Sequence, residues 1–204
     1  MTGILVYIMG PSGSGKDSLI EYARRSINAP YAQTWDVPAC VHQGVRPVLF
    51  VRRYITRPSG AAGERHSPLT GDEFQLRQKR DAFALSWESH GLCYGIDKDI
   101  DSRLAAGAVV VINGSREYAP EALKKYPALV PVLISARPEA LRSRLEKRGR
   151  ENAAGIHERL AGAAMALPDI PGLITVDNSG CLEEAGRFLT DMLNRLRQPA
   201  GAVL

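Results

Sequence analysis

The stretch Gly10-Pro11-Ser12-Gly13-Ser14-Gly15-Lys16-Asp17-Ser18 decides the fold of this chain. An apolar run from Ile4 to Met9 precedes it, and a segment with helical periodicity, Ser18 to Arg25, follows it. In a P-loop, backbone N–H groups of a glycine-rich turn and of a helix N-terminus bind phosphate oxygens, while a lysine reaches the β- and γ-phosphates. We therefore expect residues 10–18 to bind the phosphates of ATP, with Lys16 as a catalytic residue.

The residue after Lys16 departs from the usual motif. P-loops place Ser or Thr there, and the hydroxyl helps to hold Mg²⁺, whereas this chain has Asp17. Ser18 is not a substitute, because one step along a helix turns a side chain by about 100°. A carboxylate suits Mg²⁺, so we expect Asp17 to be a metal-site residue. The alternative is an acidic residue that the helix dipole favours without any metal.

Apolar runs rich in β-branched residues alternate with helix-like segments along the rest of the chain. The runs are Ile4 to Met9, Val48 to Ile55, Val109 to Ile112, Leu129 to Ser135 and Leu173 to Val176. This alternation predicts an α/β fold with a mostly parallel sheet and helices on both faces.

Two helices have the clearest sequence signals. One runs from Pro138 to Arg148, with proline in its first turn and Gly149 after its end. The other runs from Leu182 to Leu196 and is expected to bury Phe188, Leu189, Met192 and Leu196.

A single domain is expected, since 204 residues with 45% hydrophobic content suffice for one sizeable core. We assign residues 1–198 to this domain. Residues 30–47 mix Pro, Gly, Trp and His without a period and are predicted to be a surface insertion, and residues 199–204 a frayed tail.

The composition argues against several other classes of protein. The 26 Lys and Arg against 22 Asp and Glu give a net charge of +4, which suits an anionic ligand but would also suit weak nucleic-acid binding. No stretch approaches the ~18 apolar residues of a membrane span, and the N-terminal run lacks the features of a signal peptide. Three widely spaced cysteines favour free thiols in a reducing cytoplasm. We expect a cytoplasmic protein that binds small molecules, and neither nucleic acid nor a membrane.

The chain resembles the guanylate kinase branch of the nucleoside-monophosphate kinases and, more closely, the ribose 1,5-bisphosphate phosphokinases. The resemblance covers most of the chain outside residues 30–47 and the tail. Besides the P-loop, its phrases are Arg53-Tyr54-Ile55-Thr56-Arg57, Leu85-Ser86-Trp87, Tyr94-Gly95, Asn113-Gly114-Ser115-Arg116 and residues 144–152. Gly-Lys-Asp-Ser and Asn-Gly-Ser-Arg are similar to the phosphokinases and unlike ordinary guanylate kinases.

This resemblance implies a P-loop NTPase fold with a small acceptor-binding subregion at 52–96 and an arginine lid at 148–159. It implies ATP-dependent phosphorylation of the sugar phosphate ribose 1,5-bisphosphate to 5-phosphoribosyl 1-pyrophosphate in phosphonate catabolism, with Mg²⁺ as cofactor.

The resemblance also assigns contacts to the acceptor phosphate. Thr56 and Arg57 match a strand end that binds the monophosphate substrate, and the planar fork of Arg57 suits phosphate oxygens. Tyr94 matches a second phosphate contact, and His66 falls where another tyrosine stands. Without the resemblance, Arg57 could be a solvated loop charge and His66 a surface histidine.

Other positions depart from guanylate kinases. Ser86 and Asn113 stand in place of carboxylates that read guanine, and Arg53 replaces a serine near the base. Because guanine presents N–H donors, losing these acceptors should abolish most discrimination in its favour. Arg53 and Arg116 suit a substrate with a second phosphate and no base. Asn113 could instead cap the next helix, and Arg116 could be a solvated helix start.

Arg144, Arg148 and Arg150 surround Gly149, where the chain can turn. The resemblance implies that Arg148 and Arg159 are catalytic lid arginines and that residues 149–155 move. The ordinary alternative is a cationic helix end favoured by the macrodipole.

There are two rival functions, of which only the second differs from this one in class. A guanylate or other nucleotide kinase is disfavoured by Ser86 and Asn113, and a non-catalytic nucleotide-binding module by Lys16 and the arginines. A phosphate acceptor is ionised at neutral pH, so we assign no general base.

Overall fold

A computed structural model of the chain describes residues 2–27, 31–32, 44–58, 66–149, 152–164 and 169–198. The predicted tail, residues 199–204, lies outside the described residues. So does most of the predicted insertion, of which 31–32 and 44–47 are described.

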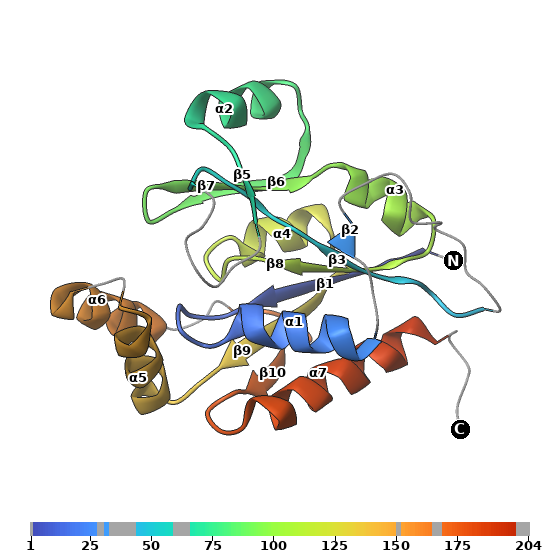
Figure 1. The fold of residues 1–204 in the computed structure, drawn as a ribbon. Coiled ribbons are helices and arrows are strands. Elements are labelled where there is room, and N and C mark those ends of the chain that lie inside the picture. Colours follow the sequence, from blue (N-terminus) through green and yellow to red (C-terminus); the bar gives the residue numbers. More distant parts are fainter. Residues whose placement is uncertain are drawn as a thin grey trace.

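The described strands and helices are interspersed along the chain (Figure 1). In chain order they are β1 (Ile4–Met9), α1 (Lys16–Ile27), β2 (Tyr31–Ala32), β3 (Val48–Val51), β4 (Tyr54–Ile55), β5 (Ser67–Pro68), α2 (Gly71–Lys79), β6 (Phe83–Ser89), β7 (Leu92–Asp97), α3 (Asp99–Ala105), β8 (Val109–Asn113), α4 (Ala119–Lys125), β9 (Val130–Ser135), α5 (Pro138–Arg148), α6 (Ala153–Ala164), β10 (Ile174–Asp177) and α7 (Leu182–Arg197).

The larger sheet has six strands in the order β10-β9-β1-β8-β3-β2, and every neighbouring pair is parallel. Its central strand β1 shows why the sheet is buried on both faces. Leu5, Tyr7 and Met9 pack into a core with α3 and α4, while Val6 and Ile8 pack into a second core with α1 and α7. The predicted α/β architecture, with a parallel sheet and helices on both faces, is confirmed.

The smaller sheet has four strands in the order β5-β4-β7-β6, of which β4 and β5 are parallel and the other pairs antiparallel. The expectation of one strand from Val48 to Ile55 is wrong. β3 pairs with β8 in the larger sheet and β4 pairs with β7 in the smaller one, and the polar Arg52 and Arg53 lie between them. The small sheet and α2 lie within the predicted acceptor-binding subregion.

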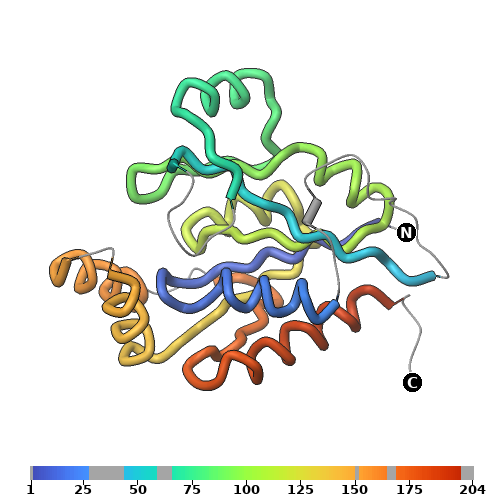
Figure 2. Tube along the Cα trace, in the orientation of Figure 1, coloured from blue at the N-terminus to red at the C-terminus, as the bar shows by residue number. Residues whose placement is uncertain are grey.

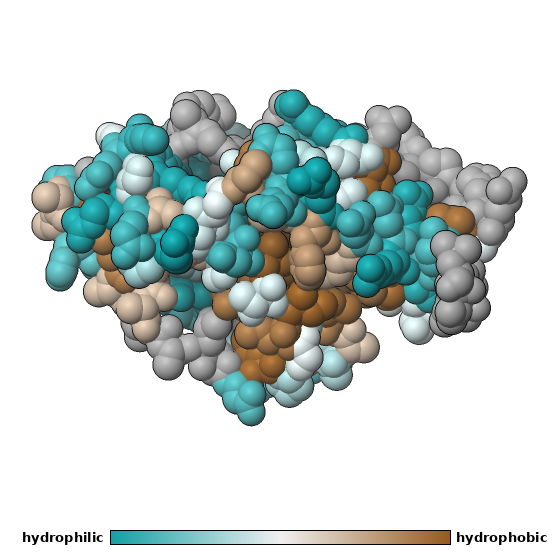
Figure 3. Space-filling model, turned by 90° about the horizontal axis from the view of Figure 1, so that it is seen from below, coloured by the Kyte–Doolittle hydropathy of each residue, from teal (hydrophilic) through white to brown (hydrophobic). Residues whose placement is uncertain are grey.

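The α5 prediction is confirmed to the residue: Pro138 is its first residue and Gly149 follows its last in a left-handed conformation, with φ of 62°. For α7 the expected buried face is wrong at Phe188, which is 52% exposed. The buried stripe runs instead through Ala185, Leu189 and Leu193. Hydrophobic residues gather near the middle of the face that carries α7 (Figure 3).

Within the described residues, no helix is both long and apolar enough to cross a membrane.

Candidate active site

The P-loop connects β1 to α1 at the carboxyl end of the large sheet. Its conformation depends on glycines with positive φ, 84° at Gly13 and 87° at Gly15. A side chain at Gly15 would begin 2.4 Å from Nδ2 of Asn178, so the loop passes this amide too closely for any other residue. Lys16 begins α1, and its Nζ donates hydrogen bonds to the carbonyls of Gly10 at 2.7 Å and Pro11 at 3.0 Å. The ammonium group therefore lies over the loop.

Side chains from late in the chain hold this loop in place. Asn178, directly after β10 and only 1% exposed, donates from Nδ2 to the carbonyl of Ser14 at 2.7 Å. Arg144 of α5 donates to the same carbonyl at 3.4 Å. Arg159 of α6 donates from Nη1 to Oγ of Ser12 at 2.9 Å. The donor side of the site is thus assembled from β1, α5, α6 and the β10–α7 connection.

The predicted lid arginines occupy different positions. Arg159 contacts the P-loop, whereas Arg148 is the exposed last residue of α5. Arg144, which we grouped with Arg148, is the member of α5 that reaches the loop. The predicted lid segment 148–159 comprises the end of α5, Gly149 and the first half of α6. Arg150 lies outside the described residues.

Asp17 and Asn113 form a hydrogen-bonded pair beside the loop. Nδ2 of Asn113 donates to Oδ1 of Asp17 at 2.8 Å, because β1 and β8 are adjacent and bring Asn113 level with Ile8. Asn113 is 7% exposed, and its Oδ1 has no hydrogen-bond partner among the described residues. Asn113 does not cap α4, whose N-cap residue is Tyr118. Ser18, the next residue along α1, is exposed.

The connection after β8 is fixed by a buried phenol. The hydroxyl of Tyr7 donates to the carbonyl of Ser115 at 2.8 Å and accepts from its N–H at 2.9 Å. Tyr7 is fully buried, and this burial raises the pKa of its phenol. Gly114 lies against the ring, where an added Cβ would be 2.1 Å from Cζ.

Arg116 follows this clamped segment and bonds to a helix. Its Nη2 donates to the carbonyl of Gly162 at 2.9 Å and its Nη1 to that of Ala163 at 3.3 Å. Desolvation lowers the pKa of Arg116, since its guanidinium is half-buried. The described partners of Arg116 therefore belong to α6.

The remaining acceptor candidates divide between the two faces of the small sheet. Tyr94 stacks on Trp87 with ring centroids 5.5 Å apart and planes at 4°, and Arg53 lies 5.2 Å from the Tyr94 centroid. Trp87 is buried and stacks in turn on Tyr118. The stacked rings of Tyr94, Trp87 and Tyr118 pack on the face of the small sheet that is turned toward the large sheet.

Ser86 faces the other way, since it pairs with Gly95 in the row next to Trp87 and Tyr94. A side chain at Gly95 would meet the ring of Phe83, which packs on Phe74 of α2. Ser86 therefore lies on the α2 face, and the structure does not bring it together with Tyr94.

Thr56 and Arg57 follow β4, and His66 directly precedes β5, the parallel strand beside it. Oγ1 of Thr56 accepts from the N–H of Cys93 at 2.9 Å, and the N–H of Thr56 donates to the carbonyl of Cys93 at 3.1 Å. Nε2 of His66 lies 3.1 Å from the carbonyl of Arg57. His66 thus supports the backbone of the predicted phosphate clamp.

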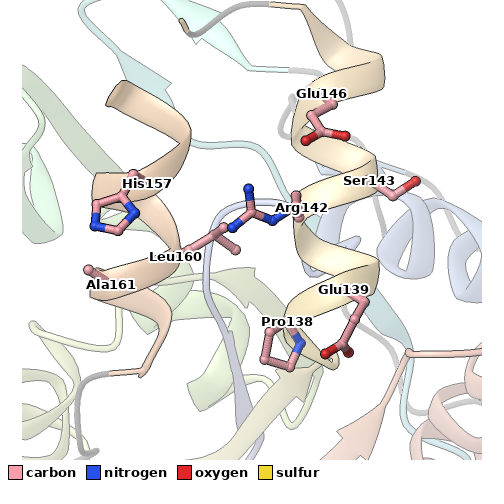
Figure 4. Close-up of a pocket in the computed structure, with 8 residues that line it drawn as sticks. All are labelled: Pro138, Glu139, Arg142, Ser143, Glu146, His157, Leu160 and Ala161. Atoms are coloured by element: carbon pink, nitrogen blue, oxygen red, sulfur yellow. The ribbon is translucent and has the colours of Figure 1, made fainter. Parts of the chain in front are cut away.

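α5 and α6 lie side by side at the end of the large sheet where the P-loop begins (Figure 2). The groove between them has a volume of about 430 Å³ and is lined by residues including Arg142, His157 and Leu160 (Figure 4). None of its lining residues is among those that contact the P-loop. We assign it no role in the reaction.

Two residues at the donor side were missed by sequence reasoning. For Asn178 the family resemblance implied only that residues 176–179 lie near the adenine of ATP, and Arg144 was not among the expected contacts. Asn178 has no local motif that would identify it. For Arg144, its position one turn before Arg148 on the same helical face was the available signal.

No protein-family model matches the chain. A curated relative from Desulfomicrobium baculatum, named ribose 1,5-bisphosphate phosphokinase PhnN, is 49% identical over 189 residues, which cover 93% of this chain and 93% of the relative. A relative of the same name from Burkholderia pseudomallei is 46% identical over 193 residues, covering 94% of this chain and 96% of the relative.

Among solved structures, guanylate kinase from Anaplasma phagocytophilum matches with a TM-score of 0.62 and 15% identity, covering 98% of this chain and 88% of that protein. At this identity the similarity establishes a shared fold.

Proposed function

The chain belongs to the ribose 1,5-bisphosphate phosphokinase family, and we propose that it transfers the γ-phosphoryl group of ATP to the 1-phosphate of ribose 1,5-bisphosphate. The products are ADP and 5-phosphoribosyl 1-pyrophosphate. The observation that carries the proposal is the P-loop on which Lys16, Arg144 and Arg159 converge.

In this reaction an oxygen of the acceptor 1-phosphate bonds to the γ-phosphorus. The bond from that phosphorus to the β,γ-bridging oxygen breaks, and its electron pair leaves with ADP. The attacking oxygen is already ionised, so the protein needs to align two anions and neutralise charge rather than remove a proton.

The donor phosphates are held by the P-loop and the start of α1. Lys16 moves from the carbonyls of Gly10 and Pro11 to the β- and γ-phosphates, a change available to a flexible four-carbon stem. Arg159, already at Ser12, stabilises charge on the transferring group. Arg148 is the second lid arginine in this proposal and approaches the nucleotide from the exposed end of α5.

Asp17 and Asn113 fit a magnesium site. The carboxylate of Asp17 offers oxygen, the ligand that Mg²⁺ prefers, and Nδ2 of Asn113 orients it. The Oδ1 of Asn113 points away from Asp17 and is a buried acceptor without a partner among the described residues. No group of three or more His, Cys, Asp and Glu side chains in the described ranges could hold a metal. This suits Mg²⁺, which takes one or two protein ligands and fills its shell with phosphates and water. A bound Mg²⁺ would neutralise charge on the β- and γ-phosphates.

In this pair the charged and the neutral residue have exchanged places relative to other P-loop enzymes. P-loop enzymes commonly combine a Ser or Thr after the lysine with an Asp on the neighbouring strand. Here the carboxylate, Asp17, follows the lysine, and the neutral group, Asn113, ends the strand. The hydrogen bond of 2.8 Å between them fixes Asn113 with its Nδ2 toward Asp17, so its Oδ1 faces away. The site therefore keeps one carboxylate, which lies on α1 instead of at the end of β8.

A double substitution tests this assignment without measuring turnover. Asp17→Ser should weaken Mn²⁺ binding to the ATP complex by about tenfold or more, measured by electron paramagnetic resonance, because it removes the only carboxylate of the pair. Adding Asn113→Asp should restore most of the affinity. A double variant no better than Asp17→Ser would contradict the exchange.

For the acceptor we propose that Arg57 clamps a phosphate, with Thr56 and His66 fixing its segment. In this proposal Asn113, at the carboxyl end of β8, and Arg53 with Tyr94, which contact each other, complete the acceptor site, while Ser86 lies on the α2 face. The neutral Ser86 and Asn113 favour a substrate that needs no carboxylate acceptors.

The experiment is a substrate panel with MgATP: ribose 1,5-bisphosphate, ribose 5-phosphate, GMP and AMP, followed by phosphorus NMR. We expect a new pair of coupled doublets from ribose 1,5-bisphosphate and little reaction of GMP. Efficient GMP phosphorylation with no consumption of the bisphosphate would contradict the proposal.

A further inference from the structure

We infer that Arg116 is a positioning residue that fixes α6, and through it Arg159, against the P-loop. This role goes beyond the phosphokinase activity, and it differs from the acceptor contact that the sequence predicted for Arg116.

Arg116 contacts the backbone of α6. Its two terminal nitrogens donate to the carbonyls of Gly162 and Ala163, two successive residues near the end of α6 as described. The planar guanidinium holds its donors in a fixed geometry, so the two hydrogen bonds together fix the position of this stretch of α6.

The base of Arg116 is rigid. Ser115 is clamped at both its N–H and its carbonyl by the buried hydroxyl of Tyr7, and the N–H of Gly114 donates to the carbonyl of Ile8 at 2.7 Å. The segment is therefore tied to β1, the strand that leads into the P-loop. Arg116 therefore links the end of α6 to β1.

The other fixed point of α6 is Arg159, which donates to Oγ of Ser12. Arg159 and Gly162 are less than one helical turn apart. Arg116 and Arg159 thus bind the same stretch of α6 to two places on the central sheet, the connection after β8 and the P-loop. Without Arg116, that stretch would rest on α5 and on the contacts of Arg159. Misplacement of a catalytic group by about 1 Å can cost a hundredfold in rate, so this support affects transfer.

The charge balance agrees with a structural partner on α6. The guanidinium is half-buried and its pKa is lowered by desolvation. No ion pair to Arg116 occurs among the described residues, so the two carbonyls of α6, together with the charge of the neighbouring Glu117, offset the cost of its burial.

The first experiment compares substrate dependence in Arg116→Ala and Arg116→Lys. If Arg116 positions α6, Arg116→Ala should raise KM for ATP or lower kcat by about tenfold while KM for ribose 1,5-bisphosphate stays within about twofold. Arg116→Lys retains the charge and one donor at a time, and should recover part of the loss. Arg195→Ala, at an exposed position near the end of α7, is the matched control and should behave as wild type.

A double-variant cycle separates positioning from a general loss of stability. Because Arg116 acts through Arg159, adding Arg116→Ala to Arg159→Ala should cause little further loss, whereas independent effects would multiply.

A second readout needs neither acceptor nor turnover. Amide hydrogen exchange within α6 should be faster in Arg116→Ala, with exchange in α1 and α7 unchanged. Because hydrogen exchange does not depend on the acceptor, a negative result would count against the role of Arg116 and not against the proposed function. The inference is overturned if KM for the acceptor rises while ATP kinetics are unchanged, if the double variant is additive, or if exchange in α6 does not change.

Discussion

The donor and acceptor sides of the site are built differently. On the donor side, Asn178, Arg144 and Arg159 all bond to the P-loop from elements more than a hundred residues away in sequence. On the acceptor side, the described bonds are shorter in range, such as Thr56 with Cys93 and His66 with Arg57. Candidate acceptor residues also lie on both faces of the small sheet.

This difference teaches that a motif locates a site better when the backbone itself binds the ligand. The P-loop binds phosphate through N–H groups whose positions follow from Gly13, Gly15 and the start of α1. An acceptor contact depends instead on which side chain faces the substrate. In a strand, adjacent residues such as Ser86 and Trp87 face opposite ways. Substitutions on each side of the site test this difference between donor and acceptor binding.

The largest effect is expected for Lys16→Ala. Its ammonium lies over the loop and buries no core atoms, so kcat should fall by at least about a hundredfold with little change in the free energy of unfolding. ADP release measures the rate, and Lys124→Ala on α4 is the control. A kcat within tenfold of wild type would remove the P-loop from the mechanism.

Asn178→Ala tests whether the donor side depends on distant support. Its amide is buried against the carbonyl of Ser14, so the free energy of unfolding should fall by about 1–3 kcal/mol, and KM for ATP should rise. Urea denaturation and initial rates measure the two effects. Asn194→Ala, near the far end of α7, should change neither. If KM for ATP is unaffected, the loop holds its shape without this bond.

Arg57→Ala should affect the acceptor side alone. We expect KM for ribose 1,5-bisphosphate to rise by about tenfold while KM for ATP stays nearly constant, because the clamp binds one substrate. The control is Arg80→Ala at the exposed end of α2. An equal loss for both substrates would place Arg57 outside the acceptor site.

The smallest effect is expected for Tyr94→Phe. The ring is stacked face to face on Trp87 and beneath Arg53, and phenylalanine preserves that stacking. If Tyr94 serves by supporting Arg53, KM for the acceptor should change by less than about threefold. A rise of tenfold or more in steady-state kinetics would instead establish a contact of the hydroxyl with the acceptor phosphate, as the family resemblance implies.

Sequence reasoning located the elements whose patterns are local. β1, the P-loop and α5 follow from apolar runs, glycines and a proline that lie close together in the chain. It failed where partners are distant: nothing near Arg116 indicates the end of α6, and nothing near Asn178 indicates Ser14. The division of Val48 to Ile55 between two sheets was missed because its apolar residues continue on both sides of Arg52 and Arg53. The exposed Phe188 shows that hydrophobic character alone does not fix a helix face.

The contact between Gly114 and Tyr7 has a consequence for the evolution of this chain. Any side chain at position 114 would begin inside the Tyr7 ring, so the two positions can change only in a fixed order. Position 7 must first lose its ring, which leaves the N–H and carbonyl of Ser115 without the hydroxyl that binds both. Each single substitution, at position 7 or at position 114, would therefore give a less stable protein. Positions 7 and 114 should therefore be inherited together, and a relative with a larger residue at 114 should carry a small one at 7.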